Sequence, residues 1–173
     1  MFIELITSIG FVIVILLSVA ILFMMDKQAR LKTVELLNKF NKYGSQNNFS
    51  FSSQEILRNA IIGLDGVHRK ILVLFTKDKL QFELIDLQEV HKCRVIKYFK
   101  SISMKEWKGK NKEAYCEKIE LHFEMNGKKS PIVITFYDKA HNHLFAISEL
   151  EQKAKRWETL LSKMINSNYQ KIA

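Results

Sequence analysis

The sequence has few of the residues that break or crosslink a fold. Its 173 residues include one proline, six glycines and two cysteines. This composition excludes collagen-like and low-complexity chains, and two cysteines are too few for a disulfide-stapled scaffold. Charged residues make up 26% and hydrophobic residues 47%, which excludes disorder throughout the chain. The length suits one domain with appendages rather than two full cores.

The sequence also lacks the short motifs of the common enzyme classes. It contains no GxSxG, P-loop, GxGxxG or HExxH pattern. His141 and His143 could share one side of an extended segment near Asp138, but a third and fourth metal ligand are not in view. Cys93 and Cys116 have no evident base and fit small buried hydrophobic residues. We therefore expect no catalytic residue, no metal site and no cofactor.

Charge is missing from one long run near the N-terminus, residues 5–25. As a helix rising about 1.5 Å per residue, this run would span roughly 30 Å, the thickness of a bilayer's hydrocarbon core. Ser18-Val19-Ala20 fits a signal-peptide cleavage site, but no Lys or Arg precedes the run and it continues beyond this point. The pattern predicts an uncleaved transmembrane helix, with residues 1–25 as the anchor.

Basic residues lie on one side of this run. Lys27, Arg30 and Lys32 follow it, whereas Glu4 is the one charged residue before it. The positive-inside rule then predicts a single-pass protein of the inner (plasma) membrane, with its N-terminus outside and its C-terminal domain in the cytoplasm. Both cysteines would then be reduced. An exported or envelope-facing domain is the alternative.

Residues 26–48 are expected to form a helical stalk and linker. An apolar stripe at spacings of three marks the helix, formed by Leu31, Val34, Leu37 and Phe40. Glu35 and Lys39 lie one turn apart in the favourable order. The helix is expected to end near Asn41, before the polar residues 43–48. The anchor or the stalk could also join two copies of the chain.

Residues 49–168 show strand patterns and then one helix. Segments 59–64 and 71–75 are apolar and flank Asp65-Gly66, a pair typical of hairpin turns. Alternation with polar neighbours predicts a half-buried strand whose inner face is formed by Leu80, Phe82 and Leu84. A further strand has Cys93, Val95 and Phe99 on one face.

A second hairpin is predicted at Asn126-Gly127, directly after an alternating segment that ends at Met125. A two-residue turn there pairs Met125 with Lys128, Leu121 with Ile132, and Ile119 with Ile134. Both apolar sets then lie on one face of the sheet.

The last predicted element is an amphipathic helix. Ser148 and Glu151 fit a capping box at its start. Its apolar stripe consists of Leu150, Ala154, Trp157, Leu161 and either Met164 or Ile165, so one face packs on the strands. Residues 169–173 remain as a tail.

Six or seven antiparallel strands and one C-terminal amphipathic helix resemble the pleckstrin-homology-like (PH-like) superfold, found in bacterial membrane proteins among others. The resemblance covers residues 49–168 and rests on the strand order, the terminal helix, and Ala154 and Trp157 on its buried stripe. It implies a mainly-β barrel or sandwich that the helix covers. Many members bind acidic lipid head groups through basic residues near the first hairpin loop, here Arg69 and Lys70. Others bind peptides or proteins.

Basic residues concentrate between Lys97 and Lys112, where six lysines and one acidic residue are interleaved with aromatic residues. We expect this segment to contact something acidic through Lys105, Trp107, Lys108, Lys110 and Lys112, with Arg69 and Lys70 as further candidates. Anionic lipid head groups and an acidic protein remain open as partners, and nucleic acid is not expected because no recognition motif is present. A loop that only keeps the protein soluble is the alternative.

These features together predict a membrane-anchored cytoplasmic binding or scaffolding module without catalytic activity. A cysteine-dependent enzyme is the alternative from another class, because either thiol could act as a nucleophile if a base lay nearby in space.

Overall fold

A computed structural model gives the structure of the chain. It describes residues 30–77, 79–101, 114–127 and 130–169, together with a few isolated positions before residue 30. Residues 166–169 are described for the backbone alone. The chain divides into two compact units, Met1–Gln46 and Asn47–Ala173.

The first unit contains a helix over residues 30–46. The predicted ion pair is present, with Lys39 Nζ lying 2.7 Å from Glu35 Oε1. The predicted end near Asn41 is wrong, because the helix continues to residue 46 and is followed by a turn. Asn48 in that turn has a positive φ of 58°, a conformation that asparagine tolerates better than most residues.

The predicted transmembrane anchor requires correction. No helix in the described part of the chain is both long and apolar enough to cross a membrane. The helix over residues 30–46 carries charged side chains along its length, as does the C-terminal helix, and charges are costly in hydrocarbon. Apart from Leu17, Ile21 and Met24, the apolar run 5–25 lies outside the described residues. The lack of a membrane-spanning helix among the described residues overturns the predicted anchor in the bilayer and the single-pass inner-membrane topology inferred from it.

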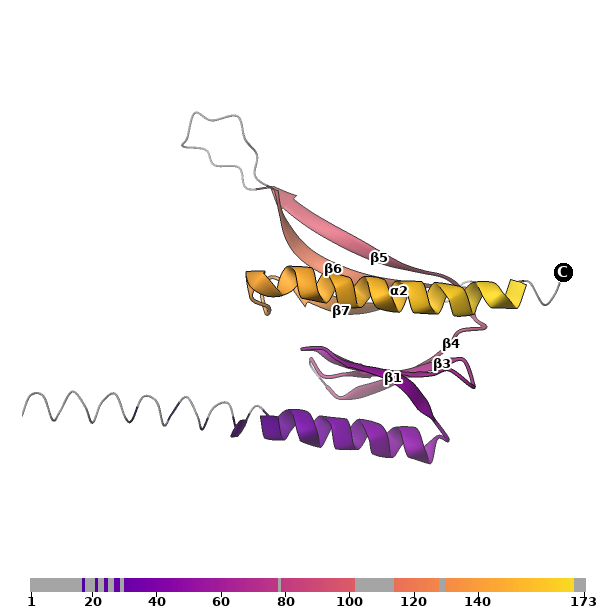
Figure 1. Cartoon of the computed structure of the whole chain (residues 1–173), viewed down its shortest axis with the longest axis horizontal. Coiled ribbons are helices and arrows are strands. Elements are labelled where there is room, and N and C mark those ends of the chain that lie inside the picture. The colour runs from indigo at the N-terminus through magenta and orange to yellow at the C-terminus, as the bar shows by residue number, and fades with distance from the viewer. Residues whose placement is uncertain are drawn as a thin grey trace, which may run out of the picture. The chain divides into compact units, whose positions relative to one another are not determined.

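The second unit is mainly β, with two antiparallel sheets and one long helix in its described part (Figure 1). The strands are β1 (Phe51–Ile56), β2 (Ala60–Asp65), β3 (Lys70–Phe75), β4 (Gln81–Asp86), β5 (Val90–Ser101), β6 (Ala114–Met125) and β7 (Ile132–Asp138). The first four form one sheet in the order β1-β2-β3-β4, and the last three form the other in the order β5-β6-β7. A short 3₁₀ helix, η1 (Leu144–Ala146), precedes α2 (Ile147–Tyr169).

The first predicted hairpin is present, with β2 and β3 paired from Asp65↔Lys70 to Ala60↔Phe75. The hairpin of β6 and β7 has a different register from the predicted one. Leu121 pairs with Ile134 and Phe123 with Ile132, a shift of two residues. The connection from Met125 to Ile132 is longer than a two-residue turn. A shift of two residues keeps Leu121, Phe123, Ile132 and Ile134 on their faces of the sheet. Between Glu120 and Ile119 the register shifts once more, so Ile119 pairs with Tyr137 instead of the predicted Ile134.

The predicted inner face of β4 is wrong. Leu80 and Leu84 are 50% and 53% exposed, whereas Ile85 is fully buried. Ile85 pairs with Ile71, and both belong to the core of the domain. Alternation identifies the residues that share a face, but β4 has apolar residues on both faces, and the pairing with β3 decides which face is inside.

One hydrophobic core joins the two sheets and α2. Ile62, Val73 and Ile85 come from the first sheet, and Leu121, Phe123 and Ile134 from the second. The residues of α2 in this core are Ala154, Trp157, Leu161 and Ile165, with Leu150 and Met164 packed against them. The predicted stripe is therefore confirmed.

The predicted capping box of α2 is wrong. The helix begins at Ile147, so Ser148 lies inside its first turn rather than at the N-cap. Glu151 instead forms ion pairs with Lys97 at 2.5 Å and Lys155 at 2.6 Å.

Replacing Trp157 with alanine should lower the free energy of unfolding by about 3–5 kcal/mol, the usual loss for a buried aromatic residue. Its side chain is 5% exposed and part of the shared core. Thr159→Ala, at an exposed position of the same helix, is the matched control and should change stability by less than about 0.5 kcal/mol. Chemical denaturation measures both, and a wild-type midpoint for Trp157→Ala would contradict the packing.

Candidate functional site

Two of the predicted contact residues, Arg69 and Lys70, lie at the turn between β2 and β3. The turn is organised by Asp65, whose side chain is 1% exposed. Its carboxylate accepts hydrogen bonds from the backbone N–H groups of Ser50, Val67 and His68, and His68 Nδ1 lies 2.8 Å from Oδ2. Burial alone would raise the pKa of Asp65, but the hydrogen bonds from His68 and Ser50 lower it to about 2.

The other predicted contact residues, Lys105, Trp107, Lys108, Lys110 and Lys112, lie outside the described residues. Their segment joins Ser101, at the end of β5, to Ala114, at the start of β6. Arg69 lies near the opposite end of β5, because its carbonyl accepts the N–H of Leu87, shortly before that strand begins. The 12 residues of β5 extend roughly 35 Å at about 3.3 Å per residue. Arg69 and Lys70 therefore lie near one end of β5, and the other basic segment follows Ser101, the last residue of β5.

The ends of β5 and β6 form a two-stranded extension of their sheet, which we name the β5–β6 arm (Phe99–Ser101 and Ala114–Cys116). Phe99 pairs with Cys116, Lys100 with Tyr115 and Ser101 with Ala114. The pairing of β7 with β6 ends at Lys118↔Asp138, so none of the described strands adds a third strand to the arm. Figure 1 shows these strand ends extending clear of β7 and α2.

The arm exposes aromatic and basic side chains. Phe99, which was expected on the inner face of its strand, is 62% exposed, and the neighbouring Tyr98 is 40% exposed. The pairing of β5 with β6 shifts between Tyr98 and Phe99, where it passes over Glu117 of β6. Phe99 lies beyond the last pair of β6 with β7, in a part of the sheet that β7 does not reach. The Lys100 side chain is 62% exposed, and Lys139 Nζ lies 3.4 Å from the centre of the Tyr115 ring.

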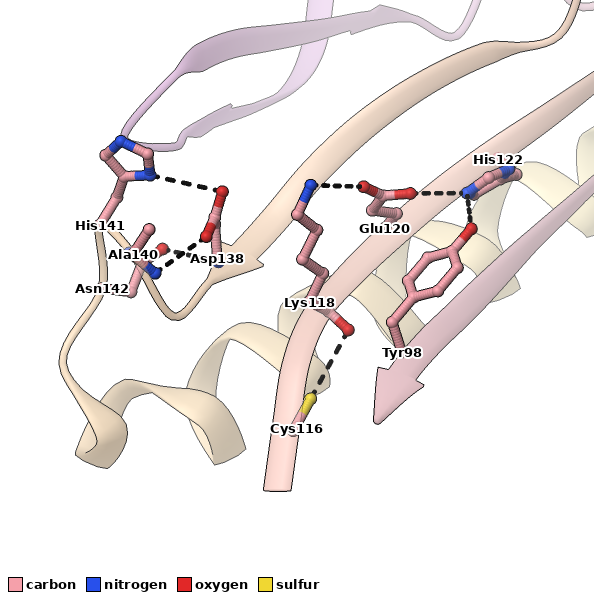
Figure 2. A network of polar contacts seen from close by, with 9 residues as sticks. All are labelled: Tyr98, Cys116, Lys118, Glu120, His122, Asp138, Ala140, His141 and Asn142. Atoms are coloured by element: carbon pink, nitrogen blue, oxygen red, sulfur yellow. Dashed lines mark hydrogen bonds and ion pairs between the residues drawn. The ribbon is translucent and has the colours of Figure 1, made fainter. Parts of the chain in front are cut away.

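The outer face of β5 and β6 carries a polar network (Figure 2). His122 Nε2 lies 3.0 Å from Glu120 Oε2 and 3.4 Å from Tyr98 Oη, while Lys118 Nζ lies 4.0 Å from Glu120 Oε1. The side chains of His122 and Glu120 are 17% and 13% exposed. Lys118, Glu120 and His122 alternate along β6 and therefore share its outer face, and Tyr98 reaches them from the neighbouring strand β5, where it pairs with Lys118.

The geometry of this network differs from that of a catalytic histidine. In a Ser-His-Asp arrangement the carboxylate binds one ring nitrogen and the nucleophile binds the other. Here Tyr98 and Glu120 both approach Nε2 of His122, as Figure 2 shows. The ring therefore cannot accept a proton from Tyr98 on one nitrogen while Glu120 holds the other.

A second polar group lies where β7 ends. The Asp138 carboxylate accepts the N–H of Ala140 at 2.9 Å, and His141 Nδ1 lies 3.3 Å from Asp138 Oδ2. Burial would raise the pKa of Asp138, but these contacts hold it below its usual value. His143 is the N-cap residue of η1 and makes no capping bond through its side chain. Within the described residues no group of three His, Cys, Asp or Glu side chains could hold a metal ion.

The two cysteines lie in environments that favour the protonated thiol. Cys93 is 4% exposed, and burial together with the nearby Glu158 carboxylate raises its pKa to about 12. Burial also raises the pKa of Cys116, whose Sγ lies 3.5 Å from the carbonyl oxygen of Lys118. Because the thiolate is the nucleophilic form, these environments do not favour cysteine catalysis.

His68, His122 and His141 each contact a carboxylate, and of these contacts only the closeness of His141 to Asp138 is expected from the sequence above. The sequence spacing between each carboxylate and its histidine could have indicated these contacts. Asp65 and Asp138 each lie three residues before a histidine in a turn, where a carboxylate and a following side chain can meet. Glu120 and His122 are two apart on one strand and therefore share a face.

Comparison with known proteins finds no family that matches the chain, and no curated protein or solved structure that matches it. The resemblance to the PH-like superfold stays a prediction.

Replacing Asp65 with asparagine should destabilise the domain by about 2 kcal/mol near pH 7, because hydrogen bonds to a buried carboxylate are lost. The folded-state pKa is lowered from 3.8 to about 2, so the carboxylate contributes stability above pH 3.8 that is lost as the pH falls through 2. The difference between wild type and variant should shrink over this range in denaturant titrations.

Asp86→Asn is the matched control. The Asp86 carboxylate accepts one exposed hydrogen bond, from the N–H of Gln88, and its replacement should cost less than about 0.5 kcal/mol. Equal losses for the two variants, or a loss at Asp65 that does not change with pH, would contradict the assigned role.

Proposed function

We propose that this domain is a binding module without catalytic activity, and that the β5–β6 arm contacts an acidic surface of a partner protein. The observation that carries the proposal is the exposure of Phe99 on a ribbon that, within the described part of the chain, has only two strands.

Exposed aromatic side chains on such a ribbon call for a physical reason. A two-stranded ribbon is only marginally stable in water, and Phe99 and Tyr98 leave apolar surface in contact with solvent. Aromatic residues that a partner can cover are the side chains that contribute most to protein interfaces. Binding to a partner would bury the Phe99 ring and supply the missing cover.

The charge of the arm indicates the chemistry of the partner. Lys100 Nζ lies 3.7 Å from Glu117 Oε1, and both side chains are exposed to solvent. Such an exposed ion pair is weak, so Lys100 can still attract an acidic partner. The segment that continues from the arm contains Lys105, Lys108, Lys110 and Lys112 in the sequence. A partner with carboxylates around an apolar pocket would complement this combination and associate faster at low salt.

The polar groups of the domain support binding rather than catalysis. His122 has both of its polar contacts on one nitrogen, and the pKa values of Cys93 and Cys116 are raised. A catalytic histidine of a triad requires its two partners on different ring nitrogens, and a thiolate nucleophile requires a lowered pKa.

The test is fluorescence anisotropy of the full chain with a labelled synthetic peptide in which single phenylalanines alternate with pairs of glutamates. We expect salt-sensitive binding, which Phe99→Ser should weaken about tenfold, as expected for an interface anchor. Replacing Lys105, Lys108, Lys110 and Lys112 with glutamine should weaken binding and flatten its salt dependence.

Phe145→Ser is the matched control, because Phe145 is 99% exposed in η1 but does not belong to the arm. This variant should bind as the wild type does. Equal affinities for Phe99→Ser and Phe145→Ser would overturn the assignment of the arm. Arm-dependent binding to phosphatidylserine vesicles without peptide binding would show that the arm recognises a lipid surface instead of a protein.

A further inference from the structure

A groove of about 200 Å³ lies between β1 and α2, on a different surface from the arm. It is lined by Ser53, Gln54 and Glu55 of β1 and by Arg156, Trp157 and Leu160 of α2. A second hollow of about 350 Å³ shares Arg156 and Leu160 and extends along α2 to Lys155, Thr159 and Lys163. Because the two hollows share residues, we treat them as one feature, the β1–α2 groove.

The two long sides of this groove differ in kind. On one side is β1, which pairs with β2 alone among the described strands and is therefore an edge strand. An edge strand directs half of its backbone N–H and C=O groups away from its neighbour, where an extended peptide can pair with them. On the other side, Leu160 is 38% exposed and lies beside the buried Trp157, which together offer an apolar surface.

β5, an edge strand of the other sheet, is closed to such pairing where α2 contacts it. The backbone N–H of Val95 in β5 is donated to Glu158 Oε1 of α2 at 2.7 Å. Two residues further along β5, Lys97 is bound to Glu151 of the same helix. Side chains of α2 thus occupy the edge of β5, whereas beside β1 a hollow remains next to the ion pair that joins Lys153 of α2 to Glu55.

The charges around the groove favour an acidic ligand. Glu55 is bound by Lys153 at 3.1 Å, and Lys155 is bound by Glu151 at 2.6 Å. Arg156 and Lys163 make no ion pair with any side chain in the described ranges and both line the groove. The uncompensated charge on the helix side is therefore positive, and an arginine can bind a carboxylate through two parallel hydrogen bonds.

We propose that the β1–α2 groove binds an extended acidic peptide of a partner protein. The peptide lies along β1, places an apolar side chain on Leu160 and Trp157, and directs carboxylates toward Arg156 and Lys163. From residue 156 to residue 163 the helix rises about 10 Å, which a segment of about four extended residues covers. This second site goes beyond the binding function proposed for the β5–β6 arm and stands on different residues.

The experiment uses the full chain and a labelled synthetic peptide in which glutamate alternates with leucine and valine over eight residues. Arg156→Glu combined with Lys163→Glu should weaken binding at least tenfold in fluorescence anisotropy. The matched control, Lys77→Glu combined with Lys79→Glu, makes the same change in net charge at exposed positions between β3 and β4 and should weaken binding less than threefold. Equal weakening by the two variants would show that only overall charge attracts the peptide and would overturn the groove.

Two further measurements separate this site from its alternatives. Binding should shift the backbone amide resonances of Ser53 and Glu55 in NMR spectra, because the peptide pairs with β1. Shifts confined to α2 would indicate a ligand on the helix alone and would overturn the extended mode. Phe99→Ser should leave this binding unchanged. Loss of peptide binding in Phe99→Ser would show that the peptide binds the arm and would overturn the groove as its site. If only the experiment on the arm fails, the proposed function is overturned and the groove proposal stands.

Discussion

The packing of α2 against both sheets is the interaction on which the rest of the domain depends. Ala154, Trp157, Leu161 and Ile165 share one core with the inner faces of the four-stranded and the three-stranded sheet. Full burial of each large apolar side chain contributes about 1.5–3 kcal/mol, so this stripe contributes a substantial part of the stability of a small domain. The polar contacts of the same helix then determine which edges are open. Glu158 and Glu151 occupy the edge of β5, and the groove beside β1 remains.

The sequence predicts the features that depend on local periodicity. The stripe of α2 follows from spacings of three and four residues, and the inner face of β6 follows from strict alternation. In β7 the adjacent Phe136 and Tyr137 are both buried, which alternation does not predict. The sequence does not determine the strand register, which depends on loop length, or the inner face of a strand with apolar residues on both faces, which depends on strand pairing. The Asn126-Gly127 pair indicates a turn near Gly127, which has a positive φ of 76°, but not the length of the connection. The inner face of β4 depends on its pairing with β3.

The candidate binding surfaces are harder to predict, since they arise from differences between elements distant in sequence. The basic segment after Lys97 is visible in the composition, but the arm exists because β7 ends its pairing at Asp138 while β5 and β6 continue. The β1–α2 groove combines residues about 100 positions apart, which no local pattern brings together. The apolar run 5–25 suggested an anchor, and the described helices contain none that spans a membrane. The function proposed here therefore rests on exposed side chains of the second unit.

Native-state hydrogen exchange at low denaturant tests the central claim most directly, because it measures whether α2 and the two sheets open together. If α2 completes a single core, the slowest amides of β2, β6 and α2 should open with the same free energy and the same dependence on denaturant. Amides of α2 around Leu161 that open at a much lower free energy, while those of β2 and β6 stay protected, would contradict the account.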